Sequence, residues 1–240
     1  MKALLVDDER LARTELRRLL RVHPDITVVG EAQNVAEAEA RLQDPSVELV
    51  FLDIQMPGGS GFGLLERLDR VPLVIFTTAY DVYAVKAFEV NALDYLLKPV
   101  VPERLAAALD RARQAFKAAV AGVATGGAAA ALPGRVFLRE GEQCWIVNLA
   151  EIKLLESEGN YTRIYFGNHR PLIPKSLRAL EARLDPALFF RASRSHILNL
   201  RWVAGIEAAI DGGLNVTLRD GPQVAVSRRQ SRWLRENFSF

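Results

Sequence analysis

Short apolar runs alternate with amphipathic stretches in the first half of the chain. The runs lie at 3–6, 26–29, 49–52, 73–76 and 95–97, separated by stretches such as "ERLARTELRRLLRV" and "VAEAEARLQ". Uninterrupted apolar runs are typical of strands covered on both faces, and alternating strands and helices are typical of right-handed crossovers. The pattern therefore predicts an α/β fold with a doubly wound, five-stranded parallel sheet.

The helical pattern ends near the middle of the chain. Leu105, Leu109 and Ala112 share one helix face, and then "AAVAGVATGGAAAALPG" (118–134) runs without a charge. Ala and Gly with a final Pro favour a flexible connection. The pattern predicts a helix that ends in an Ala/Gly linker over residues 122–134.

The second half has the alternation of half-exposed strands. "RVFLR", "CWIVNL", "IKLLESEGNYTRIYFG", "LNVTLR" and "QVAVS" are separated by Gly, Asn and Asp turns, with one amphipathic helix expected at "SLRALEARL" and a short helix after Ser227. We therefore expect a first domain at 1–121, the linker at 122–134 and a smaller, mainly β domain at 135–240.

Composition adds a difference between the halves. Half of the residues are hydrophobic and a quarter are charged, which is typical of a globular protein with a core. Residues 1–120 carry 15 Lys and Arg against 18 Asp and Glu, whereas residues 121–240 carry 16 against 11, and fourteen of those sixteen are Arg. The second half is a candidate binder of polyanions, although many solvated surfaces carry as much charge.

Targeting signals and cysteines point to the cytoplasm. No apolar segment resembles a signal peptide, and the longest uncharged stretch is mostly Ala and Gly. The single Cys144 cannot form an internal disulfide, which fits a reducing compartment. We expect a cytoplasmic protein without a membrane segment.

Polar residues follow the predicted strands of the first half. Asp7 and Asp8 follow the first strand, Asp53 ends the third, Thr77 and Thr78 end the fourth, and Lys98 follows the fifth. In such folds the carboxyl ends of the strands form the ligand site. Three carboxylates there repel one another unless a cation neutralises them, and an all-oxygen ligand set favours Mg²⁺. This is equipment for phosphoryl transfer, although a single Asp at a strand end is as often only a helix cap.

Four motifs then indicate a family. "LLVDDE", "LVFLDIQMPGGSG", "VIFTTAY" and "DYLLKP" occur in the order and spacing of the receiver domain of bacterial two-component response regulators, which the first half resembles. The resemblance implies the CheY-like, flavodoxin-like fold and a phosphoryl group on Asp53, donated by a sensor histidine kinase. It also implies Mg²⁺ at Asp7, Asp8, Asp53 and the carbonyl of Gln55.

The same resemblance assigns the remaining pocket residues. Lys98 pairs with the phosphoryl oxygens, and its peptide bond to Pro99 is expected to be cis. Thr78 matches the switch hydroxyl. Tyr95 matches the aromatic that swings inward when that hydroxyl engages phosphate, with plain packing as the alternative.

Arginine is the candidate chemistry of the second half. From Arg191 to Arg235 there are eight Arg against three acidic residues, and the planar guanidinium binds both phosphate and guanine. No helix-turn-helix, P-loop, HExxH or Gly-x-Ser-x-Gly motif is apparent, so we expect no enzyme activity from this half.

A second resemblance concerns this half. "VNLAEIKLLESEGNYTRIYF", "SLRALEARLDPALFFRASRSHILNL" and "GLNVTLRDGPQVAVSRRQSRWL" resemble the LytTR DNA-binding domain. This implies loops inserted into successive grooves of double-stranded DNA, with base-reading positions at Thr162, Arg194 and Arg229. The expected contact residues are Tyr161, Thr162, Arg163, Ser193, Arg194, Ser195, His196, Arg228 and Arg229. Arg163 or Tyr161 is the alternative to Thr162, and packing is the alternative for His196.

Together the halves predict a phosphorylation-controlled transcriptional regulator of a two-component system. Phosphate on Asp53 is expected to reorganise Thr78 and Tyr95, to favour a homodimer and so to promote promoter binding. The alternative is a phospho-regulated interaction module whose second domain docks on another protein.

Overall fold

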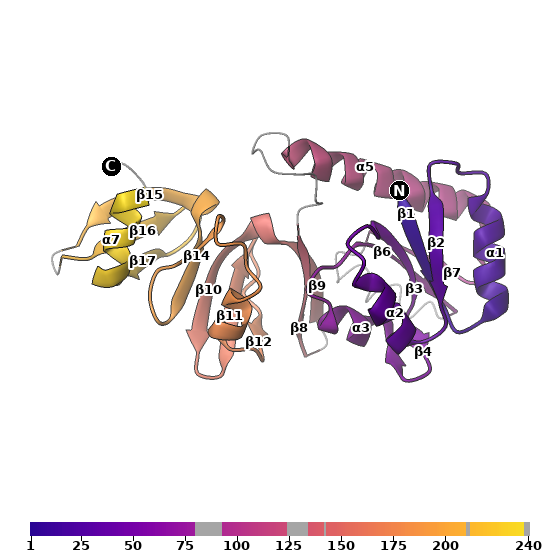
Figure 1. Cartoon of the computed structure of the whole chain (residues 1–240), viewed down its shortest axis with the longest axis horizontal. Helices are drawn as coiled ribbons and strands as arrows, with labels where there is room; N and C mark the ends of the chain where they lie inside the picture. The colour runs from indigo at the N-terminus through magenta and orange to yellow at the C-terminus, as the bar shows by residue number, and fades with distance from the viewer. Residues whose placement is uncertain (80–92, 124–133, 142, 210–211, 238–240) are drawn as a thin grey trace. The chain divides into compact units, whose positions relative to one another are not determined.

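The structure, a computed structural model, describes residues 1–79, 93–123, 134–141, 143–209 and 212–237. The chain divides into two compact units, Met1–Val147 and Asn148–Phe240 (Figure 1).

The first unit contains the predicted parallel sheet. Its strands are β1 (Lys2–Val6), β2 (Thr27–Ala32), β3 (Leu49–Asp53), β6 (Leu73–Thr78) and β7 (Asp94–Leu97). They pair in the order β2-β1-β3-β6-β7, and every pairing is parallel. The strand order reverses at β1, so the carboxyl ends of β1 and β3 lie at the point where such folds bind their ligands. The predicted fold of the first half is confirmed.

Helices cover both faces of this sheet, because successive side chains of a buried strand point to opposite faces. Leu4 and Val6 of β1 pack with α2 (Val35–Leu42) and α3 (Gly61–Arg67). Ala3 and Leu5 pack on the opposite face with α1 (Arg10–Leu20) and α5 (Pro102–Val123). Each fully buried Leu contributes about 2 kcal/mol of transfer free energy. The predicted fourth helix falls within 80–92, outside the described residues.

The segment after β3 holds the end of that strand in place. A short hairpin, β4 (Gln55–Met56) and β5 (Gly59–Ser60), leads into α3, and the Ser60 side chain caps that helix by accepting from the Gly63 N–H. Gly61 donates its N–H to the Ile54 carbonyl, and a Cβ on Gly61 would lie 2.5 Å from the Asp53 carbonyl oxygen. The close approach therefore requires glycine at position 61.

A second hairpin joins the first unit. β8 (Arg135–Glu140) and β9 (Gln143–Asn148) place Phe137, Cys144 and Ile146 in the apolar cluster of α2 and α3. The Phe137 ring stacks on Phe62 of α3 at 6.5 Å between centroids, and Arg135 accepts a hydrogen bond from the Val71 N–H. The compact unit therefore includes this hairpin, because its apolar residues are buried in the cluster of α2 and α3.

The second unit is mainly β, as predicted. Its larger sheet has the order β12-β11-β10-β14-β13, and a three-stranded sheet has the order β15-β16-β17. The strands are β10 (Ile152–Glu158), β11 (Tyr161–Phe166), β12 (Leu172–Ile173), β13 (Phe189–Arg191), β14 (His196–Asn199), β15 (Val203–Ala208), β16 (Leu214–Leu218) and β17 (Gln223–Val226). The helices are α6 (Leu177–Glu181) and α7 (Arg228–Asn237), with 3-10 turns at Leu149–Glu151 and Leu200–Trp202.

One apolar cluster holds the two sheets of this unit together. Leu154 and Leu198 of the larger sheet pack with Val216 and Val224 of the smaller sheet and with Leu234 of α7. The period-two pattern that predicted these strands is therefore the pattern of their buried faces. α7 closes the cluster, so its first residues lie at the edge of the folded unit.

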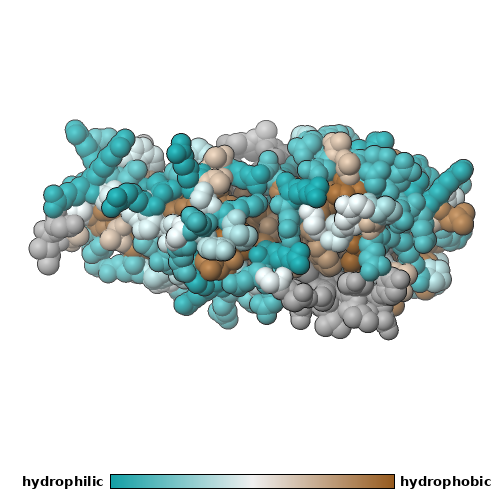
Figure 2. All heavy atoms as spheres, turned by 90° about the horizontal axis from the view of Figure 1, so that it is seen from below, coloured by the Kyte–Doolittle hydropathy of each residue, from teal (hydrophilic) through white to brown (hydrophobic). Residues whose placement is uncertain are grey.

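Hydrophilic residues cover most of the face that Figure 2 presents, and hydrophobic residues show there only as small separate areas. Within the described part of the chain, no helix combines the length and apolar character that crossing a bilayer requires.

Candidate functional site

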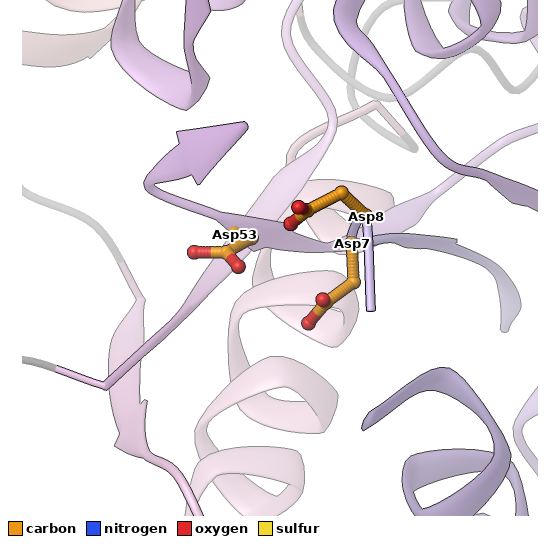
Figure 3. Close-up of side chains that lie close together, drawn as sticks. All are labelled: Asp7, Asp8 and Asp53. Carbon is orange, nitrogen blue, oxygen red and sulfur yellow. The ribbon is translucent and has the colours of Figure 1, made fainter. Parts of the chain in front are cut away.

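Three predicted acidic residues of the first unit come together at the carboxyl ends of β1 and β3. Oxygens of Asp7, Asp8 and Asp53 all lie within 4.8 Å of one another (Figure 3). Lys98 follows β7, and its Nζ lies 2.7 Å from Oδ2 of Asp7 and 2.6 Å from Oδ2 of Asp53. One ammonium group therefore bridges two carboxylates contributed by different strands.

This pocket is largely shielded from water. The side chains of Asp7 and Asp53 are 8% exposed and that of Lys98 is 15% exposed, whereas Asp8 is exposed. Burial raises the pKa of Asp7 and outweighs the opposing effect of Lys98. Burial also disfavours the charge on Lys98, but the hydrogen bonds with Asp53 and Asp7 outweigh it, so the pKa of Lys98 is raised. One largely buried ammonium group therefore faces two buried carboxylates, with the exposed carboxylate of Asp8 nearby.

Backbone groups orient the two buried carboxylates. Asp7 Oδ1 accepts from the Glu9 N–H at 3.0 Å, and Asp53 Oδ1 accepts from the Gln55 N–H at 3.1 Å. Each carboxylate therefore has one oxygen held by backbone and the other held by Lys98. The Lys98–Pro99 peptide is cis, as expected.

The predicted switch residues lie on the two strands beside the pocket. Thr78 ends β6 and is buried, and its carbonyl accepts from the Lys98 N–H at 2.8 Å. Tyr95 is half-buried in β7 against the apolar cluster on the α2–α3 face, paired with Phe76 of β6. Strand pairing therefore connects Thr78, Tyr95 and Lys98.

The predicted contact residues of the second unit gather at one end of its larger sheet. β10 pairs with β11 on one side and with β14 on the other, so Glu156 has Arg163 and His196 as its two neighbours. The Ser157 N–H donates to the Ser195 carbonyl at 2.8 Å. Tyr161, at the start of β11, is 48% exposed.

The start of α7 lies at the same end. The Ser227 N–H donates to the Ala192 carbonyl at 2.9 Å, which places the exposed Arg228 and Arg229 beside the Ser193–Ser195 turn. Arg194 is exposed on that turn. Three segments that are far apart in the sequence thus present hydroxyl and guanidinium groups together.

Comparison with known proteins decides the family. The family described as "Response regulator receiver domain" matches residues 3–110, and the "LytTr DNA-binding domain" matches residues 142–239. The sensory transduction protein LytT of Enterococcus faecalis is 35% identical over 241 residues, which cover 98% of both chains. The chain belongs to the LytTR-type response regulators.

Two further proteins are similar to this chain, one over nearly its whole length and one over about half of it. The transcriptional regulatory protein BtsR of Salmonella typhimurium is 35% identical over 248 residues, which cover 98% of both chains. The response regulatory domain of protein mrkE from Klebsiella pneumoniae is 34% identical, with 49% of this chain and 99% of that chain covered and a TM-score of 0.45. The two family matches and the full-length relatives make the chain a two-component response regulator with a receiver domain and a LytTR DNA-binding domain.

One predicted base-reading residue of the LytTR domain needs correction. Thr162 is 0% exposed, and its hydroxyl donates to the Lys175 carbonyl at 2.8 Å. Its strand position explains this, because alternate residues of β11 face the core. The exposed Tyr161 and the half-buried Arg163, the alternatives expected for this contact, remain the candidates at this end of the sheet.

Arg163 is already held within the domain. Its guanidinium pairs with both carboxylate oxygens of Glu158 and donates to the Arg170 carbonyl at 2.9 Å. The pair lowers the pKa of Glu158. Any DNA contact by Arg163 therefore competes with a bidentate ion pair.

Sequence reasoning missed the residues that support the Ser193–Ser195 turn. Arg191 donates to the Ser193 and Arg194 carbonyls at 2.5 and 2.6 Å and pairs with Glu181 of α6 at 2.7 Å. His196 contacts both serine hydroxyls and lies 3.5 Å from Glu156. His196 therefore has polar neighbours on both sides of its ring. The only sequence signal for Arg191 was its place two residues before the turn.

Proposed function

We propose that Asp53 accepts a phosphoryl group from a sensor histidine kinase and that this modification controls DNA binding by the LytTR domain. The observation that carries the proposal is the bridge from Lys98 to Asp7 and Asp53 at the carboxyl ends of the strands. A carboxylate oxygen of Asp53 attacks the phosphorus, and the kinase histidine leaves. Lys98 remains beside the transferred group and offsets its charge.

The pocket suits Mg²⁺. Its donors are three carboxylates whose oxygens lie within 4.8 Å, and Mg²⁺ prefers such hard oxygen ligands. Asp7, Asp8 and Asp53 would hold the ion, together with the Gln55 carbonyl. When bound, the ion supplies charge neutralisation for the phosphoryl oxygens. Asp8 is exposed, and each Asp7 oxygen, already accepting one hydrogen bond, keeps a second lone pair for the ion.

Phosphorylation then acts through the neighbouring strand ends. The Thr78 hydroxyl turns toward the phosphoryl group, and Tyr95 repacks into the space that opens. These changes reach the surface at the end of β7 and the start of α5, where Leu97 and Val101 are 42% and 49% exposed. A homodimer through this surface would bring two LytTR domains to paired DNA sites, and linked binding raises avidity.

On DNA, the exposed end of the larger LytTR sheet enters the grooves. Arg194 and Arg229 contact bases, because a guanidinium can pair with both acceptors of guanine. The remaining exposed or half-buried groups of this end contact phosphates: Ser193, Ser195, Arg228, Tyr161 and Arg163. Their common position at one end of the domain supports this division.

A selection from random DNA tests the proposal. The full chain is selected with and without beryllofluoride, an acyl-phosphate mimic, in the presence of Mg²⁺. We expect enrichment of one sequence, tighter binding with the mimic, and no effect of the mimic on Asp53→Asn. Asp110→Asn, an exposed carboxylate on α5, is the control.

Two results would contradict the proposal. Full stimulation of the Asp53→Asn protein would remove Asp53 from the mechanism. DNA affinity that is weak and indifferent to sequence would instead favour a LytTR domain that docks on another protein.

A further inference from the structure

A connected polar network lies behind the Ser193–Ser195 turn. Both serine Oγ atoms lie 3.1 Å from Nδ1 of His196, and the two Oγ atoms are 3.3 Å apart. On its other side, Nε2 of His196 lies 3.5 Å from Oε1 of Glu156. Oε2 of Glu156 accepts a hydrogen bond from the Tyr165 hydroxyl. The network thus runs from the exposed turn into the sheet.

The Tyr165 end of this network carries a proton at neutral pH. Burial and the Glu156 carboxylate raise the pKa of Tyr165 to about 12, so Tyr165 remains a donor at neutral pH. An ionised carboxylate only accepts hydrogen bonds, and a neutral imidazole carries one N–H. Glu156 lies nearer Nε2, at 3.5 Å, so its negative charge favours the tautomer that carries the N–H there and leaves Nδ1 as an acceptor.

In this tautomer, both serine hydroxyls donate their protons to hydrogen bonds inside the turn. Nδ1 has one lone pair, so one serine hydroxyl donates to it, and the other can donate to the first hydroxyl oxygen. Ser193 Oγ also accepts from the Ser195 N–H at 3.2 Å. Around neutral His196 both hydroxyl protons point inward, and the turn offers DNA phosphates mainly oxygen lone pairs.

Protonation reverses the chain of hydrogen bonds. Nδ1–H then donates to a serine oxygen, and at least one hydroxyl proton is released toward the surface. A positive charge appears behind the turn at the same time, stabilised by Glu156. Both changes favour a phosphate oxygen at the turn.

We infer that His196 is a positioning residue whose proton state decides whether Ser193 and Ser195 present donors to the DNA backbone. This makes promoter affinity depend on pH through one hydrogen-bond network. The inference rests on the proposed contact between this turn and DNA. His196 remains 26% exposed and Glu156 33% exposed, so protons exchange readily with water.

Other charged groups lie around the network. The cleft of about 520 Å³ beside His196 is lined by Glu156, Tyr165, Lys153, His169, Arg170 and Asp220, among others. Arg191 of β13 holds the turn carbonyls. His169 is the second histidine of this cleft, so it provides the matched control.

The expected result concerns DNA affinity of the beryllofluoride-treated full chain at constant ionic strength. Binding should become roughly 3- to 10-fold tighter from about pH 8 to about pH 5.5, as expected for a hydrogen bond to a charged group. His196→Asn should flatten this profile, because its amide N–H₂ reaches the position of Nδ1 and donates at every pH. His169→Gln should keep the profile.

Removing the two serine hydroxyls distinguishes a hydrogen-bond effect from a general effect of the charge on His196. In the Ser193→Ala, Ser195→Ala double variant, the pH-dependent gain should shrink by at least half. Nitrogen-15 NMR of the free chain should find Nδ1 of His196 unprotonated at about pH 8. A proton on Nδ1 at that pH, or an unchanged profile in His196→Asn, overturns the inference.

Failure of the underlying DNA contact has a different signature. If the Arg194→Ala protein and the double serine variant bind DNA as tightly as the parent at every pH, the turn does not contact DNA. In that case the proposed interface fails, whatever NMR reports for the tautomer.

Discussion

The receiver pocket and the exposed end of the LytTR domain use charge in opposite ways. In the pocket, two carboxylates that are nearly buried share one ammonium group. At the LytTR end, Arg194, Arg228 and Arg229 are exposed. Arg163 and Arg191 are instead held in ion pairs with glutamates of the same domain. The pocket encloses its opposite charges away from water, whereas the LytTR end keeps three of its cations in water.

The difference has an energetic consequence. Breaking a buried pair leaves an uncompensated charge in a poor solvent, while an exposed cation loses little when its surroundings change. Substituting a charged residue in the pocket should therefore lower the free energy of unfolding. Substituting an exposed arginine at the LytTR end should instead change DNA selectivity and leave stability unchanged.

The largest effect is expected for Lys98→Met. Without Mg²⁺, Asp7 and Asp53 would face each other unneutralised, so the free energy of unfolding should fall by about 3 kcal/mol. Urea unfolding in EDTA measures it, with Lys117→Met, an exposed lysine on α5, as the control. A loss equal to that of the control would mean that water already solvates the two carboxylates.

The corresponding change at the LytTR end is Arg194→Ala. We expect a loss of about 1–3 kcal/mol in DNA binding, with relaxed selectivity at one base pair and unchanged stability. Binding to single-base variants of the selected sequence measures it. Arg201→Ala is the control, because Arg201 is exposed beyond the opposite end of β14. An equal loss on every sequence would identify Arg194 as a phosphate contact.

Arg191→Lys tests the support behind that surface. Lysine keeps the charge but cannot donate in a fork to the Ser193 and Arg194 carbonyls while pairing with Glu181. DNA binding should weaken by about 1 kcal/mol on all sequences, because the turn shifts in position while its contact residues stay the same. Arg178→Lys on α6 is the comparison. Selectivity that changes at a single base pair would argue for direct contact instead.

The smallest effect is expected for the surface pair of Asp25 and Arg113. The hydrogen bond from Arg113 lowers the pKa of Asp25 to about 2. A lowered folded-state pKa stabilises the fold above the unfolded value, and this contribution is lost as pH falls from about 4 to about 2. Because Asp25 is about half exposed, Asp25→Asn should cost well under 1 kcal/mol at neutral pH.

Urea midpoints of Asp25→Asn and the parent should therefore converge as pH falls through that range. Asp110→Asn, which removes the other carboxylate beside Arg113, should cost no more. A cost as large as that of Lys98→Met would erase the contrast between buried and exposed charge.

Local patterns predicted much of the receiver and its pocket. The apolar runs became the strands of the sheet, and Asp7, Asp53 and Lys98 meet where those strands end. This succeeded because a parallel sheet brings its carboxyl ends to one edge whatever the details of packing. The LytTR surface is harder to predict from the sequence, since its residues lie on turns that are supported by segments distant in the chain. Thr162 shows this, because its hydroxyl is committed to Lys175 across a strand pair.

Short periodicities and motif spacing encode the alternation of strands and helices, the mainly β second domain and the acidic residues at the strand ends. The packing of the β8–β9 hairpin on α3, the hold of Arg191 on the Ser193–Ser195 turn and the place of His196 between that turn and Glu156 became visible only in the folded chain. Each of these depends on atoms brought together from separate strands, and the spacing of residues along the chain carries no record of such contacts until the sheets form.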